Sequence, residues 1–557
     1  MKRLASLLLA GVLLLTAACS SQAPTETQTG VDETDPAQTQ AASSVVEELR
    51  IGTTASIDGT NVMTENGIFG KLNYNAVVTA PFVVTDENGE VQPYFMTDWT
   101  LSEDMNTITA SFATDQGITW HDGEPVTMDD VVFTFQYLID RQSSYCSGLV
   151  GVEAVDDTTA VLTLTDGKGF TMLNSMANFV TLRPEHVWSK VEGEYAEYTG
   201  EDAAIGCGPY RLADVDQDAQ IMTLEAVGDT YMGQELTVQK LVVRTYDSHD
   251  ALVMALRNGE VDAMYDYSNS LNATMVDSVT GIEDLDPGMS DNPGNYQLVF
   301  GFNKQPTDDL IFRQAVRAAL DYELLRVTIG GENGQIPHTG IIAPPNKGFD
   351  GSLPQLEQDV DEANALLDQG GYLDVNGDGW REMPDGSEMN VLITPQYNQT
   401  RQALYLRIAE VLQANLAEIG VQTSMDEESV RNSDHATEVR KQGTYELYIG
   451  YTSPGVAMYD SAFMYIIGNN GNNPWGTCLI PEFVSAYEAK KTAGSYEAYN
   501  AAVEELQAIA DEQVVGLALC WDKAYFPYRT DKYEGWTNFP GWGVINWKTW
   551  FSTRPAV

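Results

Sequence analysis

The sequence predicts a mixed α/β protein with more than one lobe. A chain of 557 residues is too long to be built around a single hydrophobic core. Residues 107–113 and 159–165 alternate apolar and polar side chains with a period of two, as half-buried strands do. Residues 307–325 and 401–419 instead have apolar side chains at helical spacing, and Gly420 follows as a stop signal. Strands and helices are therefore mixed along the chain, which indicates an α/β architecture.

The acidic composition limits the partners of the protein. Its 81 acidic and 30 basic residues give a formal net charge of −51 and a pI near 4.1. Neutralising nucleic-acid phosphates needs clustered Lys and Arg, so the composition argues against nucleic acid and against a polybasic contact with anionic lipid. We interpret the acidity as a solvated surface that keeps the protein soluble. A preference for cationic solutes is the alternative.

The first residues predict export. Lys2 and Arg3 precede an apolar run over residues 4–15, which is shorter than a bilayer span and has the flanks of a secretory signal. Small residues at 16–18 then lead to Cys19, as at a lipoprotein cleavage site. We expect a signal peptide over 1–18 and acyl chains on Cys19 that hold the protein at the membrane. The alternative is an ordinary signal peptide followed by a chance cysteine.

Residues 19–47 are rich in Ser, Thr, Gln, Asp, Glu and Pro and have no periodic apolar pattern. This composition predicts a disordered tether. A flexible chain of that length has an end-to-end distance of roughly 30 Å. Such a tether lifts a globular body off the membrane surface and keeps it near an embedded partner.

Residues 117–135 combine a strand end, a tight turn and a capped helix. The Asp122-Gly123 pair supplies the turn, because glycine tolerates positive φ and aspartate can bond its own backbone. Thr127 and Asp130 have the spacing of a capping box. We interpret His121 beside Asp122 as part of this structural unit rather than as an acid/base pair. One face of the helix is predicted to be apolar, with Val131, Val132, Phe135, Leu138 and Ile139.

The same segment resembles the signature of the family 5 extracytoplasmic solute-binding proteins, which are the oligopeptide, dipeptide and nickel receptors of ABC importers. Met128 stands where the family usually has Ala. Further likeness lies in residues 206–210 (GCGPY), 313–321 and 363–372. The matched signature positions are Trp120, His121, Asp122, Gly123, Pro125, Val126, Thr127, Asp130 and Val131.

The resemblance covers nearly all of the chain after residue 47. It implies a bilobal, periplasmic-binding-protein-like fold of mixed α/β class. We expect lobe I over 48–300, with an extra subdomain inserted at about 86–203, then lobe II over 301–515 and a return to lobe I over 516–557. The chain would then cross between the lobes twice, near 300 and near 515, and two crossings make a hinge.

The function implied by the resemblance is that of a substrate-binding lipoprotein of an ABC importer. It would act as a monomer on the extracytoplasmic face of the cell membrane, capture a solute by hinge closure and deliver it to ABC permease and ATPase subunits. A peptide is the first expectation for the solute. The alternatives are a surface solute sensor or adhesin on the same fold, and a binder of a metal chelate or an oligosaccharide. No cofactor is expected.

One family element for ligand binding is altered in this chain. In peptide-binding relatives a G-W-x-x-D element supplies a carboxylate for the peptide α-ammonium, whereas residues 450–454 here read Gly-Tyr-Thr-Ser-Pro. Burying an ammonium without a partner would cost several kcal/mol. Either Asp460 or another acid replaces the missing group, or the ligand has no free amino terminus. The residues implied to bind ligand are Tyr74, Tyr397, Asn398, Arg401, Tyr451, Thr452, Ser453, Tyr459, Asp460 and Trp475.

Patterns for catalysis and metal binding are weak. The chain lacks G-x-S-x-G, H-E-x-x-H, P-loop and G-x-G-x-x-G motifs, so we predict a binding protein and not an enzyme. Asp374, Asn376 and Asp378 have the alternate spacing of a calcium loop. However, Asp385 stands where a bidentate Glu is usual, and we prefer to interpret the segment as a plain acidic hairpin without metal.

Four further cysteines follow Cys19, and their spacings form no metal-binding pattern. An even number in an exported protein allows disulfides, but the sequence leaves the pairing open, and buried thiols are an equal alternative. A catalytic role for Cys207 would need an activating base, and none is implied. The cysteines are Cys146, Cys207, Cys478 and Cys520.

Overall fold

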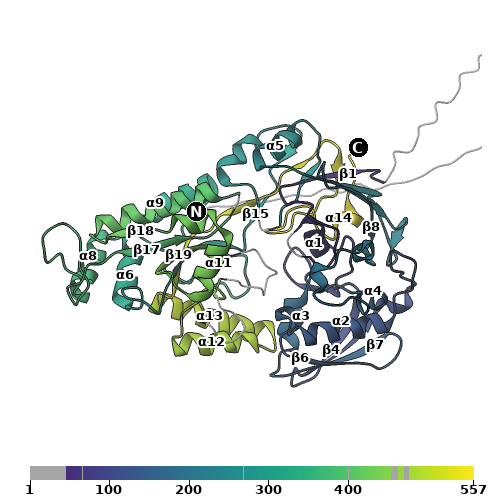
Figure 1. Cartoon of the computed structure of the whole chain (residues 1–557), viewed down its shortest axis with the longest axis horizontal. Coiled ribbons are helices and arrows are strands. Elements are labelled where there is room, and N and C mark those ends of the chain that lie inside the picture. Colours follow the sequence, from purple (N-terminus) through teal and green to yellow (C-terminus); the bar gives the residue numbers. More distant parts are fainter. Residues whose placement is uncertain are drawn as a thin grey trace, which may run out of the picture. The chain divides into compact units, whose positions relative to one another are not determined.

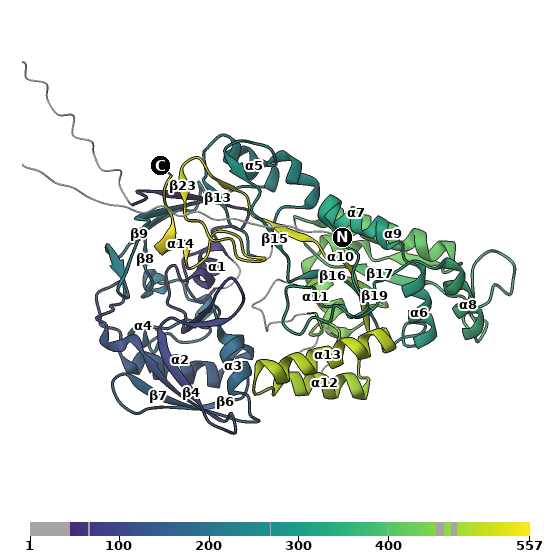
Figure 2. The same ribbon diagram turned by 180° about the vertical axis from the view of Figure 1, so that it is seen from behind.

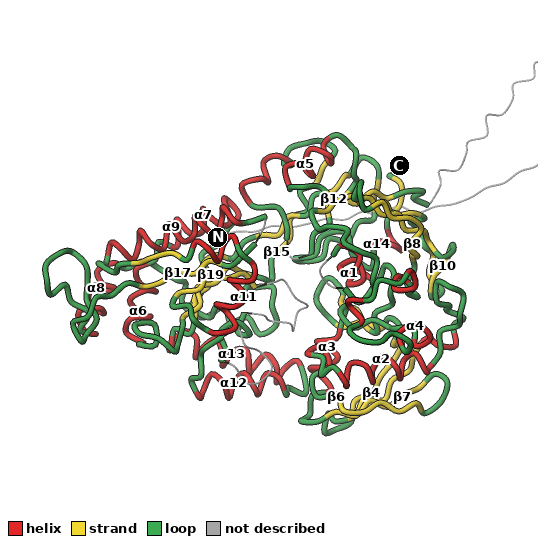
Figure 3. Tube along the Cα trace, viewed as in Figure 1, coloured by secondary structure: helices red, strands yellow, loops and turns green. Residues whose placement is uncertain are grey.

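The computed structural model describes residues 45–64, 67–267, 269–398, 400–452, 462–468 and 476–556. These residues build two bodies, here named lobe I and lobe II, each with its own sheet and hydrophobic core (Figures 1 and 2). Lobe I takes residues 45–287 and 526–556, and lobe II takes residues 294–520. Strands and helices are mixed in both bodies (Figure 3), which confirms the expected α/β class.

Lobe I is organised around a seven-stranded mixed sheet. In sheet order its strands are β14 (Leu285–Asp286), β22 (Tyr528–Arg529), β13 (Ala263–Met264), β1 (Leu49–Thr53), β12 (Lys240–Thr245), β9 (Ile221–Ala226) and β8 (Tyr210–Asp216). Strand β1 runs parallel to both neighbours, while β9 and β8 continue the sheet antiparallel. Gly52 in β1 allows helix α5 (His249–Arg257) to pack closely, because an added Cβ would lie 2.1 Å from a methyl carbon of Leu252.

A four-stranded antiparallel sheet forms a further part of lobe I. Its order is β4 (Met96–Leu101), β5 (Thr107–Phe112), β7 (Thr159–Leu164) and β6 (Leu149–Ala154). Strands β5 and β7 confirm the two strands predicted from the alternating pattern. Helix α2 (Met128–Asp140) packs against β6, and its apolar face enters the core of lobe I.

The signature at residues 117–135 folds around one buried carboxylate. Thr127 and Asp130 form the predicted capping box, in which the Asp130 carboxylate accepts a hydrogen bond from the Thr127 backbone N–H at 2.9 Å. The same carboxylate accepts from Trp120 Nε1 at 3.2 Å and from the Glu185 backbone N–H at 2.9 Å. Asp130 therefore ties the turn, the helix start and a neighbouring segment together.

Lobe II has a five-stranded sheet that is buried on both faces. Its order is β18 (Thr423–Met425), β17 (Val391–Pro395), β19 (Leu447–Thr452), β16 (Asn295–Phe300) and β20 (Gly516–Cys520). All residues of β16, β19 and β20 are buried, as expected when helices cover both faces of a sheet. One face packs on α6 (Leu310–Ala319), α7 (Tyr322–Gly330), α8 (Val360–Gly370) and α9 (Gln402–Glu418), the other on α12 (Pro481–Lys491) and α13 (Tyr496–Gln513).

The helix predicted over residues 307–325 is in fact two helices, α6 and α7. Leu320 between them has an extended backbone, and each helix has an aspartate cap of its own. Asp309 accepts from the Ile311 backbone N–H at 3.0 Å, and Asp321 accepts from the Leu324 backbone N–H at 2.8 Å. The apolar pattern continues across the break because both helices pack on the same core.

The remaining elements are short. The two-stranded ribbons are β2 (Val83–Thr85) with β3 (Val91–Pro93), β10 (Thr230–Tyr231) with β11 (Gln234–Glu235), and β23 (Tyr533–Glu534) with β24 (Arg554–Pro555). The further α-helices are α1 (Ile68–Leu72), α3 (Gly169–Met176), α4 (Glu185–Trp188), α10 (Glu427–Arg431), α11 (Ser433–Gln442) and α14 (Thr549–Ser552).

Two chain crossings join the lobes. Strand β15 (Met289–Asp291) on the first crossing pairs antiparallel with β21 (Lys523–Tyr525) on the second, and Figure 1 shows β15 between the two bodies. Strand β16 belongs to the lobe II sheet from Asn295 onward, and β20 belongs to it as far as Cys520. The crossings therefore lie at residues 288–293 and 521–525.

The C-terminal return completes lobe I. The Trp550 side chain is fully buried, and its Nε1 donates to the Asn75 carbonyl oxygen at 2.7 Å. Trp547 Nε1 donates to the Thr85 carbonyl oxygen at 2.8 Å. Among the helices of the described ranges, none combines the length and the apolar character needed to cross a membrane.

Candidate functional site

Arg401 connects the two lobes at the hinge end of the lobe II sheet. It is only 3% exposed, and its Nη1 donates to Tyr296 OH at 2.8 Å. Its Nη2 donates to the Ser270 carbonyl oxygen of lobe I at 3.0 Å. The guanidinium also lies 5.1 Å from the ring centroid of Tyr451 and 5.9 Å from that of Tyr296, a favourable arrangement for a cation. The buried Arg401 guanidinium thus contacts residues of both lobes.

The loop before α9 fixes the position of Arg401. Asn398 Oδ1 accepts from the backbone N–H groups of Thr400 and Arg401, at 3.1 and 3.0 Å, so it closes the turn that opens the helix. Thr400 Oγ1 donates to Asn269 Oδ1 of lobe I at 2.8 Å, which adds a second contact between the lobes. Tyr397 is half-buried in the same loop.

Tyr451 and Thr452 end strand β19 at the same edge. Tyr451 OH accepts from Asn292 Nδ2 at 3.1 Å, so its ring is tied to the first chain crossing. Thr452 Oγ1 accepts from the Asn295 backbone N–H at 2.9 Å. Four of the predicted residues, Tyr451, Thr452, Asn398 and Arg401, are therefore brought to the hinge end of lobe II.

Asp522 is a charged group at the hinge that sequence reasoning missed. It is half-buried after β20 and accepts from Asn292 Nδ2 at 2.8 Å. Burial raises the pKa of Asp522 to about 6, while the Arg401 charge and the Asn292 hydrogen bond act in the opposite direction. The signal that could have marked it is an acidic residue that follows the apolar stretch at 514–519.

Tyr74, the predicted residue from lobe I, belongs to a cluster of aromatic rings. Its ring centroid lies 5.0 Å from that of Phe179 and 5.1 Å from that of Tyr267. Tyr267 in turn lies 5.1 Å from Trp542, and Phe179 stacks on Tyr145 at 5.0 Å. Sequence reasoning missed the other four rings of this cluster, because no local pattern brings these distant positions together.

Contacts also join the lobes away from the hinge. Helix α3 of lobe I lies beside α12 and α13 of lobe II in both views (Figures 1 and 2). Thr171 Oγ1 donates to the Lys491 carbonyl oxygen at 2.9 Å, and Tyr496 OH donates to Asn174 Oδ1 at 3.1 Å. The rings of Phe170 and Tyr496 meet edge to face at 5.0 Å. We name these contacts the α3–α13 contact.

Several predicted residues lie outside the described residues. These are Cys19, the proposed lipid-attachment site, and four candidate ligand-binding residues. Their roles stay predictions. The four are Ser453, Tyr459, Asp460 and Trp475.

The acidic segment that resembles a calcium loop is bonded to its own backbone. Asp374 accepts from the backbone N–H groups of Gly377 and Gly379, at 2.7 and 3.0 Å. Asn376 Oδ1 accepts from the Asp378 backbone N–H at 2.8 Å. The oxygens that calcium would need are thus engaged as in a hairpin turn. In the residues that the structure describes, no group of three or more His, Cys, Asp or Glu is placed to hold a metal ion.

His121 and Asp122 bond to different partners. His121 Nε2 lies 3.0 Å from the Gly208 carbonyl oxygen, and Asp122 lies 2.8 Å from His186 Nε2. Burial lowers the pKa of His121. This arrangement agrees with the structural role interpreted from the sequence.

The four cysteines after Cys19 are buried thiols that form no disulfide. Burial raises the pKa of Cys146 to about 12 and that of Cys478 to about 11. It also raises the pKa of Cys207 and Cys520. Thiols held in the neutral form are poor nucleophiles, so these four residues offer no thiolate for catalysis.

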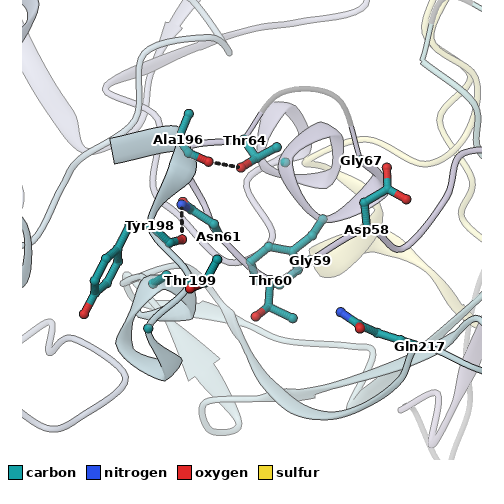
Figure 4. Close-up of a pocket in the computed structure, with 14 residues that line it drawn as sticks. Asp58, Gly59, Thr60, Asn61, Thr64, Gly67, Ala196, Tyr198, Thr199 and Gln217 are labelled. Carbon is teal, nitrogen blue, oxygen red and sulfur yellow. Dashed lines mark hydrogen bonds between the residues drawn. The ribbon is translucent and has the colours of Figure 1, made fainter. Parts of the chain in front are cut away.

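A separate cavity of about 340 Å³ lies within lobe I (Figure 4). Asn61 Nδ2 donates to the carbonyl oxygens of Tyr195 and Tyr198, at 2.7 and 2.8 Å, and Thr64 Oγ1 donates to that of Ala196 at 3.3 Å. These bonds hold the segment after β1 against the loop near residue 200. A ligand in this cavity would not touch lobe II, and none of the predicted site residues lines it.

Two lobes with separate cores, joined by two paired crossings and by polar contacts near them, define a two-lobed α/β fold. Residues 90–475 match the family model of the bacterial extracellular solute-binding proteins, family 5. The chain therefore belongs to this family.

Curated relatives match part of the chain. The oligopeptide-binding protein AppA of Bacillus subtilis is 27% identical over 341 residues, which are 58% of this chain and 59% of AppA. The nickel-binding periplasmic protein of Escherichia coli is 23% identical over 382 residues, 66% of this chain and 69% of that protein. Relatives from Brucella species are 26% identical over 351 residues, and the chain spans 61% of their length.

Solved structures match more of the chain. Bacillus subtilis AppA in complex with a nonapeptide has a TM-score of 0.72 at 18% identity, over 92% of this chain and 99% of AppA. A periplasmic oligopeptide-binding protein of Thermotoga maritima has a TM-score of 0.75 at 20% identity, over 92% and 99%. These likenesses establish the shared two-lobed fold.

Proposed function

We propose that this protein is the substrate-binding lipoprotein of an ABC importer, which captures a solute between its lobes and delivers it to a membrane permease. The observation that carries the proposal is the hinge. Two crossings, paired as β15 and β21, connect two lobes that each have a core of their own. Such a connection allows rigid-body closure around a ligand. Membership of the family supports the same mechanism.

The proposed ligand site lies where the hinge end of lobe II faces the aromatic cluster of lobe I. Tyr451 and Arg401 are buried, so they act by shaping the floor of the site and by linking it to the crossings. Ring faces and backbone groups would supply most contacts to the solute. The residues proposed to contribute are Tyr74, Tyr397, Asn398, Arg401, Tyr451 and Thr452, with Ser453, Tyr459, Asp460 and Trp475 as further predictions.

A peptide is the proposed cargo. Support comes from the relatives, of which two from Bacillus subtilis are named an oligopeptide-binding and a dipeptide-binding protein. Other members differ: one relative is a nickel-binding protein, and a Thermotoga maritima structure holds mannohexaose. A metal chelate and an oligosaccharide are therefore tested beside peptides.

The decisive experiment begins with native mass spectrometry of the protein without its first 18 residues, purified from its host, to detect a retained solute. Thermal unfolding then compares tri-alanine, N-acetyl-tri-alanine, a nickel–histidine complex and mannohexaose. A ligand at a hundred times its dissociation constant adds about 2.7 kcal/mol to the free energy of unfolding. Stabilisation by a peptide supports the proposal. Stabilisation only by the nickel–histidine complex or by mannohexaose would replace the peptide as the proposed cargo. Chemical turnover of a bound solute would contradict a binding role.

The lipid anchor is tested separately. A fatty-acid analogue fed to cells should label the full chain and leave Cys19→Ser unlabelled, because acyl chains on this residue would hold the protein at the membrane. Equal labelling of both chains would refute the anchor. Light scattering of the protein without its first 18 residues should give the mass of a monomer.

A further inference from the structure

A pocket of about 290 Å³ lies where lobe I, lobe II and the hinge meet. Residues from both lobes line it, so neither lobe encloses it alone and its full shape depends on lobe closure. The lining residues are the turn 85–89 between β2 and β3, Pro293 of the first crossing, Pro345 of lobe II, and Phe539, Pro540 and Trp542 of the C-terminal return.

Both walls of the pocket are bonded to the first crossing. On the lobe II side, Asn346 Nδ2 donates to the Pro293 carbonyl oxygen at 2.8 Å. On the lobe I side, the Gly541 backbone N–H donates to Ser290 Oγ at 3.2 Å, within the turn that carries Phe539 and Trp542. Closure of the hinge and the distance between the two walls are therefore mechanically linked.

Apart from the turn 85–89, the walls of the pocket are apolar. Three prolines, Phe539 and Trp542 line this part, and the Trp542 ring centroid lies 5.1 Å from that of Tyr267 in the aromatic cluster. A volume near the lower end of the range of about 300–1,000 Å³ that holds whole small ligands suits one bulky group of a larger solute.

The two carboxylates at the rim of the pocket, Asp86 and Glu87, already have bonding partners within the protein. Asp86 accepts from the backbone N–H groups of Asn88 and Glu90, both at 2.9 Å, and Glu87 forms an ion pair with Lys548. No carboxylate among these rim residues requires a cation from a ligand. Lys347, two residues from the lobe II wall, pairs with Glu90 and so holds the rim of lobe I against lobe II.

We propose that this pocket is a subsite for an uncharged aromatic or large aliphatic group of the solute. The proposal rests on the proposed function, since the occupant belongs to the captured solute. Filling the pocket buries apolar surface against both lobes at once. The group therefore favours the closed arrangement as well as adding affinity.

The test is calorimetric titration of the protein with tri-alanine and with the three tripeptides in which Phe replaces Ala at one position. We expect at least one of these peptides to bind about tenfold more tightly than tri-alanine, as burial of a Phe side chain allows. Pro345→Asp places a charge in the wall and should remove this preference. Pro344→Asp is the matched control, because this neighbouring proline is exposed and does not line the pocket.

The outcomes separate the subsite from the function. Equal binding of all four peptides, or a preference that survives Pro345→Asp, refutes the subsite and leaves peptide capture standing. Failure of every peptide to bind the wild-type protein refutes peptide capture, and the subsite with it. Pro540→Asp on the opposite wall repeats the test if Pro345→Asp does not fold, with circular dichroism as the check on folding.

Discussion

Asn292 and Asp522 lie 230 positions apart in the chain, yet the Asn292 amide donates to the Asp522 carboxylate at 2.8 Å. One residue follows β15 on the first crossing and the other precedes β21 on the second. Because the same amide donates to Tyr451 OH, the hinge and the proposed ligand site share one polar group. A change in the charge of Asp522 should therefore change both the free energy of unfolding and the closure of the lobes.

Asp522 should give the protein a characteristic pH dependence. Its folded-state pKa is raised to about 6, whereas an unfolded Asp has a pKa of about 3.9. Between these values the folded state holds the proton more tightly, so the free energy of unfolding falls as the pH rises through this window. Denaturant unfolding of the wild type and of Asp522→Asn from pH 4 to 8 measures this change in the free energy of unfolding. The wild type should lose stability relative to the variant up to about pH 6, and not beyond. The exposed Asp218→Asn should run parallel to wild type.

Arg401→Met should destabilise the protein by about 2–3 kcal/mol, because buried hydrogen bonds from a charged donor to Tyr296 and Ser270 are lost. It should also raise the pKa of Asp522 further, since Arg401 now lowers it. Arg407→Met, on the exposed face of the same helix, is the control and should stay within about 0.5 kcal/mol of wild type. A loss no larger than that of the control would show that Arg401 does not support the hinge.

Tyr496→Phe should weaken the α3–α13 contact. The variant loses the hydrogen bond to Asn174 and keeps the ring contact with Phe170, so the arrangement in which α3 and α13 touch should lose about 1 kcal/mol, or about fivefold in population. Energy transfer between dyes on the two lobes measures the population of this arrangement. The rate of solute release is measured beside it. Tyr198→Phe removes a matched bond to Asp202 within lobe I and should change neither. Identical release from both variants would contradict the assignment.

Gly52→Ala should cost about 1–3 kcal/mol of stability, because the added Cβ would overlap Leu252 and force α5 away from β1. Gly59→Ala is the control, since nothing lies within 4 Å of its added Cβ. Chemical unfolding of both variants measures the difference. A Gly52→Ala protein as stable as the control would mean that α5 shifts without cost.

The parts of the fold that depend on sequence neighbours were predictable. Thr127 and Asp130 are three residues apart, so the capping box can be read directly, and the helix predicted over 401–419 is observed as α9. Leu320 shows the limit of such reasoning. Apolar periodicity runs through the break between α6 and α7, and only the aspartate caps Asp309 and Asp321 mark the start of each helix.

The candidate site was predictable only in part. Family likeness pointed to Arg401, Tyr451 and Tyr74, but their partners come from other parts of the chain. Asp522 and Trp542 come to the proposed site because the chain returns into lobe I. Periodic patterns in the sequence report only neighbours along the chain and give no information on such long-range contacts. The bond from Arg401 to lobe I was missed for the same reason.

The buried position of Trp550 has a consequence for biosynthesis. Its indole fills the core formed by residues from the first part of the chain and donates to the Asn75 carbonyl oxygen. Lobe I therefore remains incomplete on the ribosome until residue 550 has been made, although β1 can pair with β12 and β13 as soon as residue 264 has been made. A nascent chain that cannot finish its first lobe stays loosely structured, which is the state that a translocation channel for unfolded polypeptides accepts.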